Sequence, residues 1–164
     1  MIIFGIDPGT TITGYGVIKA HNNSVSWVDS GVIKTNRCGL PDKLLAIYNG
    51  LIGKMREYTP ERVCIEKAFY AKNVHTTLIL GHARGVAILA AKMVGACVAE
   101  YSPREIKKSV VGNGNAAKEQ VEYMIRALLS MPSRSAHADV YDALAAALCD
   151  FQNYRFRPMA MQKR

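Results

Sequence analysis

The alternation of apolar and polar positions predicts a strand-rich beginning and a mixed remainder. Five short apolar runs are typical of buried strands, at residues 1–7, 12–19, 24–35, 61–69 and 96–102. The polar residues 21–24 between the second and third runs indicate the turn of a hairpin. The first three strands are therefore expected to form a meander.

Helical periodicity occupies most of the remaining sequence. Apolar residues recur at helical spacing across residues 40–58, and further helices are predicted at residues 75–93, 116–129 and 138–151. A short helix or turn is expected at 103–112. Three strands followed by alternating helices and strands favour an α/β fold, with a five-stranded mixed β-sheet flanked by α-helices. We expect one domain over residues 1–154 and a basic, disordered tail over 155–164.

The composition suits a single globular domain with an anionic partner. The chain has 164 residues, 49% of them hydrophobic, which is enough for a full core. Its formal net charge of +8 favours nucleic acid, phosphate or acidic lipid as a partner, although a basic protein can also simply be soluble.

Two features of the sequence favour a cytoplasmic protein. The beginning lacks a basic segment and meets Asp7 early, unlike a signal peptide, and no apolar run approaches the roughly 18 residues of a membrane helix. The cysteines are far apart and mostly within apolar stretches, at Cys38, Cys64, Cys97 and Cys149. Buried thiols in a reducing compartment explain them better than zinc or disulfides.

Four of the thirteen acidic residues lie in apolar surroundings. Asp7 ends the first predicted strand, Glu66 lies at the end of the fourth, and two more, one helical turn apart on the last helix, are Asp139 and Asp142. Because ligands gather at the carboxyl ends of strands in α/β sheets, these four carboxylates could form an all-oxygen cage. Hard divalent cations such as Mg²⁺ and Mn²⁺ prefer sites of this kind.

Individual acids also have purely structural interpretations. Asp7 could cap the amides of the following turn, Glu66 could be the polar end of an edge strand, and Asp139 could cap the last helix. Glu100 and Asp150 are weaker candidates for metal binding, since Asp150 is expected where the last helix begins its exit to solvent.

Five segments together resemble the RuvC family of Holliday junction resolvases: IDPGTTITGYGVI, CIEKAFYAKN, LGHARGVAIL, YSPREIKKSVVGNGNAAKEQV and DVYDALAAAL. The likeness runs in the family's order from residue 1 to about 150, and it implies a ribonuclease H-like fold. It also implies that the catalytic, metal-binding acids are those that stand out by context, namely Asp7, Glu66, Asp139 and Asp142.

The resemblance further implies a crossover junction endodeoxyribonuclease. Such an enzyme nicks two strands of like polarity at a four-way DNA junction, in homologous recombination and DNA repair. Two Mg²⁺ ions per active site, replaceable by Mn²⁺, would activate water and stabilise the leaving oxygen. A homodimer would supply two active sites, and the family's branch-migration proteins RuvA and RuvB would be partners.

Three DNA-binding residues are implied by the same resemblance. Lys107 and Lys118 flank a stretch rich in glycine and asparagine whose amides could hold phosphates. Phe69 follows Glu66, where it could stack on an unpaired base. The alternatives are a solvated helix face for the lysines and core packing for Phe69. His137 could orient water, or be merely a solvated residue before the helix.

The segment LGHARGVAILAAKMVG, residues 80–95, is the expected dimer contact. Its glycines and alanines would let a partner helix approach closely. The same pattern also suits a helix buried within one subunit.

Three rival functions share parts of this pattern. A YqgF-type nuclease acting on RNA would have a similar fold, but the lysine-bearing NGNAAK stretch and the aromatic residues after Glu66 favour the resolvase. An ATP-binding protein of the actin and sugar-kinase type needs two such domains, for which 164 residues are too few. A non-catalytic nucleic-acid-binding module would not need four acids, which weaken binding to DNA unless metal compensates their charge.

Overall fold

A five-stranded mixed β-sheet forms the centre of the protein in the computed structural model, which describes residues 1–35, 38–67, 73–131 and 137–155. The strands are β1 Ile2–Asp7, β2 Ile12–His21, β3 Ser24–Lys34, β4 Arg62–Glu66 and β5 Cys97–Tyr101. Their order across the sheet is β3-β2-β1-β4-β5. The first three strands form the expected antiparallel meander, and β4 and β5 extend the sheet in parallel from β1. The predicted mixed sheet is confirmed.

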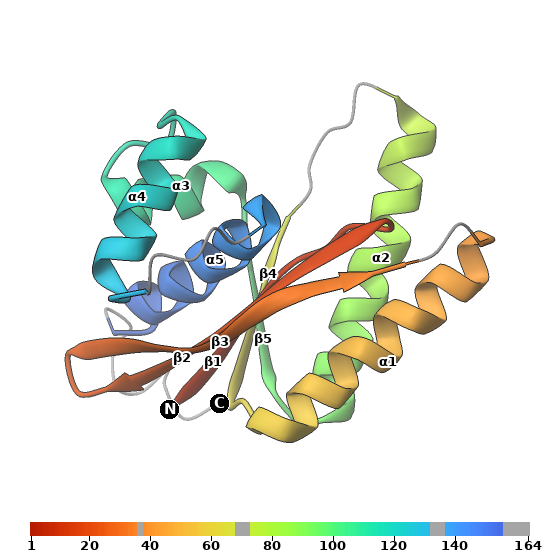
Figure 1. Ribbon diagram of the computed structural model, residues 1–164, viewed down its shortest axis with the longest axis horizontal. Helices are drawn as coiled ribbons and strands as arrows, with labels where there is room; N and C mark the ends of the chain where they lie inside the picture. Colours follow the sequence, from red (N-terminus) through yellow and green to blue (C-terminus); the bar gives the residue numbers. More distant parts are fainter. Residues whose placement is uncertain (36–37, 68–72, 132–136, 156–164) are drawn as a thin grey trace.

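Five helices cover the two faces of this sheet (Figure 1). They are α1 Leu40–Tyr58, α2 Val74–Met93, α3 Pro103–Val111, α4 Lys118–Leu128 and α5 Ala138–Arg155. On one face α5 lies directly on the strands, with α3 and α4 packed outside it, while α1 and α2 cover the other face. The fold is therefore a three-layer α/β arrangement in which α5 is the central helix of one layer.

The alternation of side chains along β1 feeds two separate hydrophobic cores. Ile3 belongs to the core beneath α5, whereas Phe4 and Ile6 belong to the core beneath α1 and α2. All three side chains are fully buried. Because successive residues of a strand point to opposite faces, Gly5 and Asp7 share the α5 face with Ile3.

Glycines in β1 and β2 allow α5 to lie unusually close to the sheet. A Cβ atom at Gly5 would lie 1.9 Å from the carbonyl oxygen of Ala143, and one at Gly16 would lie 2.5 Å from the side chain of Leu144. Contacts this short are impossible, so any larger residue at these positions would push the helix outward. The glycines therefore fix the height of α5 above the sheet.

The segment expected to be a short helix or turn is the helix α3. Ser102 caps its first turn in a capping box with Glu105, Pro103 occupies the first helical position, and Gly112 ends it with a φ of 77°. The fourth strand ends at Glu66, whereas the sequence predicted a strand to residue 69. Residues 68 and 69 lie outside the described part of the chain.

Two expectations about buried residues were wrong. Only two of the four cysteines are buried, Cys64 and Cys149, whereas Cys38 and Cys97 are exposed. Cys97 begins β5, which lies at the edge of the sheet and therefore lacks a neighbouring strand on one side. Asp150, expected near solvent, is completely buried because α5 continues to Arg155 and still packs on the sheet at this position.

Candidate active site

Asp7 and Glu66 end neighbouring parallel strands and therefore lie side by side. Ile6 of β1 pairs with Ile65 of β4, so the next position along each strand is a carboxylate. The tight turn that follows Asp7 is closed by Thr13, whose Oγ1 donates to the carbonyl oxygen of Gly9 over 2.6 Å. Glu66 is not on an edge strand, because β4 lies between β1 and β5. That structural interpretation of Glu66 is wrong.

The first turn of α5 brings Asp139 and Asp142 to the same end of the sheet. Gly14 of β2 pairs with Asp7, and a Cβ atom on Gly14 would lie 2.0 Å from the carbonyl oxygen of Asp139 and 2.9 Å from its Cβ. The backbone of Asp139 thus rests on the strand residue opposite Asp7. Asp142 follows one helical turn later on the same side of the helix.

The two carboxylates at the strand ends lie close enough to other acids for their ionisation to be affected. Burial, followed by the negative charges of Asp142 and Asp139, raises the pKa of Asp7 to about 7. Burial, followed by the charges of Asp7 and Asp142, raises the pKa of Glu66 to about 8. A buried group of like charges is unfavourable unless a proton or a cation compensates it. The cluster is therefore suited to binding cations.

Two cationic or protonatable side chains contact the carboxylates of α5. Lys118, the first residue of α4, places its Nζ 3.0 Å from Oδ2 of Asp142, and Nδ1 of His137 contacts Oδ2 of Asp139. The charge of Lys118 also lowers the pKa values of Asp7 and Glu66 against the stronger effects that raise them. His137 is exposed just before α5, and its ring is placed against a predicted metal ligand.

The donor set of this cluster fits hard divalent metal ions. It consists of carboxylate oxygens at the carboxyl ends of β1 and β4 and at the start of α5, and Mg²⁺ and Mn²⁺ prefer oxygen ligands. Across the described residues, no three acidic, histidine or cysteine side chains already converge on one point. The two α5 carboxylates instead contact Lys118 and His137.

The loop between α3 and α4 lies beside the acidic cluster. Lys107 of α3 donates from its Nζ to the carbonyl oxygen of Ala116 over 2.7 Å, and its charge reaches Glu66. A Cβ atom on Gly114 would lie 2.5 Å from the side chain of Arg104, so the loop is packed tightly on α3. Lys107 and Lys118 therefore lie at the same rim. The third predicted DNA-binding residue, Phe69, lies outside the described residues.

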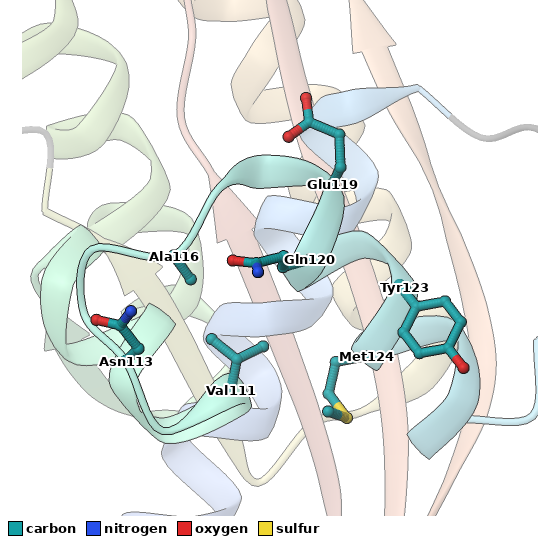
Figure 2. Close-up of a pocket in the computed structure, with 7 residues that line it drawn as sticks. All are labelled: Val111, Asn113, Ala116, Glu119, Gln120, Tyr123 and Met124. Atoms are coloured by element: carbon teal, nitrogen blue, oxygen red, sulfur yellow. The ribbon is translucent and has the colours of Figure 1, made fainter.

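A separate hollow of about 490 Å³ lies between α3 and α4, and none of the four acids lines it (Figure 2). In Figure 2, Val111 of α3 and Gln120 and Met124 of α4 line its walls, and Tyr123 lies at its border. Its one carboxylate among the described residues is Glu119. A hollow without converging acids or bases is a weaker candidate for hydrolytic chemistry than the four-carboxylate cluster.

Sequence reasoning missed one buried polar group beneath the candidate site. Arg62 of β4 forms an ion pair with Asp150 of α5, and the hydroxyl of Tyr101 also donates to Asp150. An arginine at the start of the apolar strand sequence RVCIE was the available signal, because a buried arginine requires an acidic partner. Glu100, the other weak candidate, pairs with Arg84.

The order of the strands and the helices on both faces define a protein with a ribonuclease H-like α/β fold. The family model described as "Crossover junction endodeoxyribonuclease RuvC" matches residues 3–150. The chain belongs to this family.

Individual relatives agree with this assignment. The crossover junction endodeoxyribonuclease RuvC of Shewanella frigidimarina is 47% identical over 154 residues, covering 94% of this chain and 88% of that protein. The protein of the same name from Ruminiclostridium cellulolyticum is 45% identical, with 94% of both chains covered. The structure of Thermus thermophilus RuvC in complex with a Holliday junction substrate has a TM-score of 0.89 and 29% identity, covering 94% of this chain and 95% of that one.

Proposed function

We propose that this protein is a Holliday junction resolvase, an endonuclease that nicks two strands of like polarity at a four-way DNA junction in homologous recombination and repair. The observation that carries the proposal is the group of four carboxylates at one end of the sheet in a chain of the RuvC family. The structure of a related RuvC with a Holliday junction substrate supports the choice of DNA substrate.

Asp7, Glu66, Asp139 and Asp142 are the residues that would hold the metal, which we propose to be two Mg²⁺ ions, replaceable by Mn²⁺. When bound, the ions would activate a water molecule and stabilise the leaving 3′ oxygen of the phosphodiester. Asp7 is the most central ligand, since its ionisation is coupled to both acids of α5. Burial of Asp7 and Glu66 strengthens their attraction for a cation.

Lys118 has two tasks in this proposal. It neutralises Asp142 at an Nζ to Oδ2 distance of 3.0 Å, and it remains 69% exposed at the side chain, so a DNA phosphate can also approach it. Lys107 holds the loop through the carbonyl oxygen of Ala116 and adds positive charge beside Glu66. We propose that Phe69 stacks on an unpaired base at the junction centre.

We further propose a homodimer formed through α2. Leu78 and Leu89 are exposed by 60% and 54% on the outer side of this helix, next to an apolar hollow of about 540 Å³ between α1 and α2. Gly81 and Gly85 line the same hollow, with open space where a Cβ atom would lie. A two-fold pair would present two acidic clusters to the two strands that are cut.

The apolar character of α2 is also a property of membrane-spanning helices. By length and composition α2 could cross a membrane, which corrects the expectation that no segment approaches this length. A helix that packs on a sheet and on a partner passes the same test, and here Ala83, Ala87, Ala90 and Ala91 are buried against the sheet. We therefore propose that the exposed side of α2 contacts a partner subunit. We also propose that the enzyme is cytoplasmic and that RuvA and RuvB are its partners.

The direct test is incubation of the purified protein with a labelled four-way DNA junction, with and without Mg²⁺. We expect paired, symmetrically placed nicks that require the metal, and little cleavage of linear duplex. An RNA hairpin of similar length serves as the comparison substrate. Cleavage of the hairpin with no metal-dependent cleavage of the junction would contradict the proposal.

A further inference from the structure

A buried polar network lies on the α5 face of the sheet, below the acidic cluster. Its members are Arg62 of β4, Tyr101 of β5 and Asp150 of α5, which we call the Asp150 brace. The Nε and Nη2 atoms of Arg62 lie 2.5 and 2.8 Å from the two carboxylate oxygens of Asp150, and the Tyr101 hydroxyl lies 3.2 Å from Oδ1. Asp150 has no exposed surface, and the Arg62 side chain is 9% exposed.

The brace contacts α5 from the start of β4 and from the end of the neighbouring strand β5. Arg62 is the first residue of β4, whereas Tyr101 is the last residue of β5 and pairs with Glu66. Both side chains nevertheless reach the same carboxylate, so they extend toward each other along the sheet. Tyr154, one turn after Asp150, places its ring 4.8 Å from the Arg62 guanidinium. Sliding α5 in either direction would break one of these contacts.

The two principal elements joined by the brace are those that carry three of the four acids. Arg62 and Glu66 lie on the same face of β4, four residues apart, and Asp142 and Asp150 lie eight residues apart on α5. The glycines of β1 and β2 set the height of α5 above the sheet. The bidentate ion pair adds a contact with a defined direction along the sheet.

Stability alone is a poor explanation for such a pair. Removing two charges from water is costly, and well-packed apolar residues of similar volume often stabilise a protein as much or more. The attested benefit of a buried ion pair is that it selects one packing arrangement among several.

We infer that the Asp150 brace positions α5 on β4, so that Asp139 and Asp142 meet Asp7 and Glu66 in the geometry that binds metal. Arg62, Tyr101 and Asp150 are positioning residues in this inference, since they would act through the placement of α5 and are not among the proposed metal ligands. This inference rests on the proposed role of the four acids. A misplacement of about 1 Å caused by a mutation far from the reacting groups can cost about 10²-fold in rate.

The test is a triple variant, Arg62→Met with Tyr101→Phe and Asp150→Leu, which removes every polar member and leaves no buried group unpaired. Mn²⁺ affinity is measured by calorimetry, the melting temperature by circular dichroism without metal, and the cleavage rate on a junction with saturating metal. We expect a melting temperature close to that of the wild type, Mn²⁺ binding about 10-fold weaker, and cleavage about 10–100-fold slower.

A matched control separates positioning from general loosening of the fold. Lys54 and Asp29 form an ion pair of 3.3 Å between α1 and β3, which carry none of the four acids. The double variant Lys54→Met with Asp29→Asn should leave Mn²⁺ affinity and cleavage unchanged. Equal losses in the control and in the triple variant would overturn the inference, as would normal Mn²⁺ affinity in a folded triple variant.

Two further variants cover the remaining outcomes. Arg62→Lys keeps the positive charge but loses the bidentate contact, so it should fold and show a smaller loss of Mn²⁺ affinity than the triple variant. Wild-type Mn²⁺ affinity in Arg62→Lys would overturn the inference, even if the triple variant did not fold. Asp7→Asn tests the site itself. If Mn²⁺ binding survives Asp7→Asn, the proposed metal site is wrong and the positioning role fails with it.

Discussion

The two faces of the sheet differ in how closely their helices are fitted to the strands. On the α5 face, Gly5 and Gly16 bring the helix into contact with the strand backbone, and the ion pair of Arg62 and Asp150 is buried beneath it. On the other face, side chains lie between helix and strands: a Cβ atom on Gly50 of α1 would lie 2.8 Å from the side chain of Ile33 of β3. The difference teaches that the helix backbone approaches the strands directly on the face that carries the proposed metal ligands, whereas side chains separate helix and sheet on the other face.

The largest expected effect is that of Asp7→Asn, on the closely fitted face. Cleavage of a junction should fall by about 10²–10³-fold or more, because a charged metal ligand is lost. Junction binding in the absence of divalent metal should survive. Above pH 7 the metal-free variant should also melt about 3–6 °C higher, since burial and the neighbouring acids raise the pKa of Asp7 to about 7 and make its ionisation at higher pH unfavourable.

The matched control for this variant is Asp42→Asn, which alters an exposed acid in the first turn of α1. It should change neither cleavage nor melting temperature. Normal cutting by Asp7→Asn would show that this carboxylate is not a metal ligand.

Two alanine substitutions compare a strand glycine beneath α5 with an exposed glycine of α1. In Gly14→Ala, the added methyl would meet the backbone of Asp139, so the free energy of unfolding should fall by about 1–3 kcal/mol and cleavage should fall with it. In Gly53→Ala, nothing lies within 4 Å of the added methyl, and the helix should gain about 0.5–1 kcal/mol. Urea denaturation measures both. Equal effects of the two substitutions would refute the close contact of Gly14 with α5.

The exposed side of α2 can be tested by changing the state of association. Leu78→Glu combined with Leu89→Glu should convert a dimer to a monomer of about 18.0 kDa in sedimentation equilibrium, because two charges would be buried at the contact. Paired nicking should become single and uncoordinated. Leu128→Glu, on α4, is the control for added surface charge. A wild-type mass of one chain at micromolar concentration, with full junction cleavage, would contradict the dimer.

The smallest expected effects concern single phosphate contacts. Lys107→Ala and Lys118→Ala should each weaken junction binding and lower the slope of log affinity against log salt by about 0.9. Lys118→Ala should also slow cleavage, because Asp142 loses its neighbouring ammonium group. The matched control is Lys43→Ala on α1. An unchanged salt slope would mean that the two lysines do not contact DNA phosphates.

Short-range patterns in the sequence predicted most of the fold. The alternation in β1 and the helical spacing across α1 are local signals, and the structure confirms the elements they indicate. The four acids stood out because charges in apolar segments are unusual. Asp150 was misjudged for the opposite reason: its counter-charge, Arg62, lies 88 residues away in the sequence, and only the folded chain brings them together.

The contacts of the lysines also could not be predicted from the local sequence pattern. A lysine at the start of α4 looks like any solvated charge, and its contact with Asp142 depends on how α4 packs against α5. The distance of α5 from the sheet could likewise not be predicted from the local sequence. Gly14 and Gly16 read as ordinary small residues of a strand, and their role becomes clear only when Asp139 and Leu144 are found directly above them.

The position of α5 in the chain has a consequence during protein synthesis. Asp7 and Glu66 emerge from the ribosome early, but α5 follows the other strands and helices and is the element that covers their face of the sheet. A nascent chain that lacks α5 would expose the apolar residues Ile3 and Ile18 to solvent. Such a chain would require protection from aggregation. It would also be unable to cut DNA, because two of the four proposed metal ligands would be missing until the last helix is made.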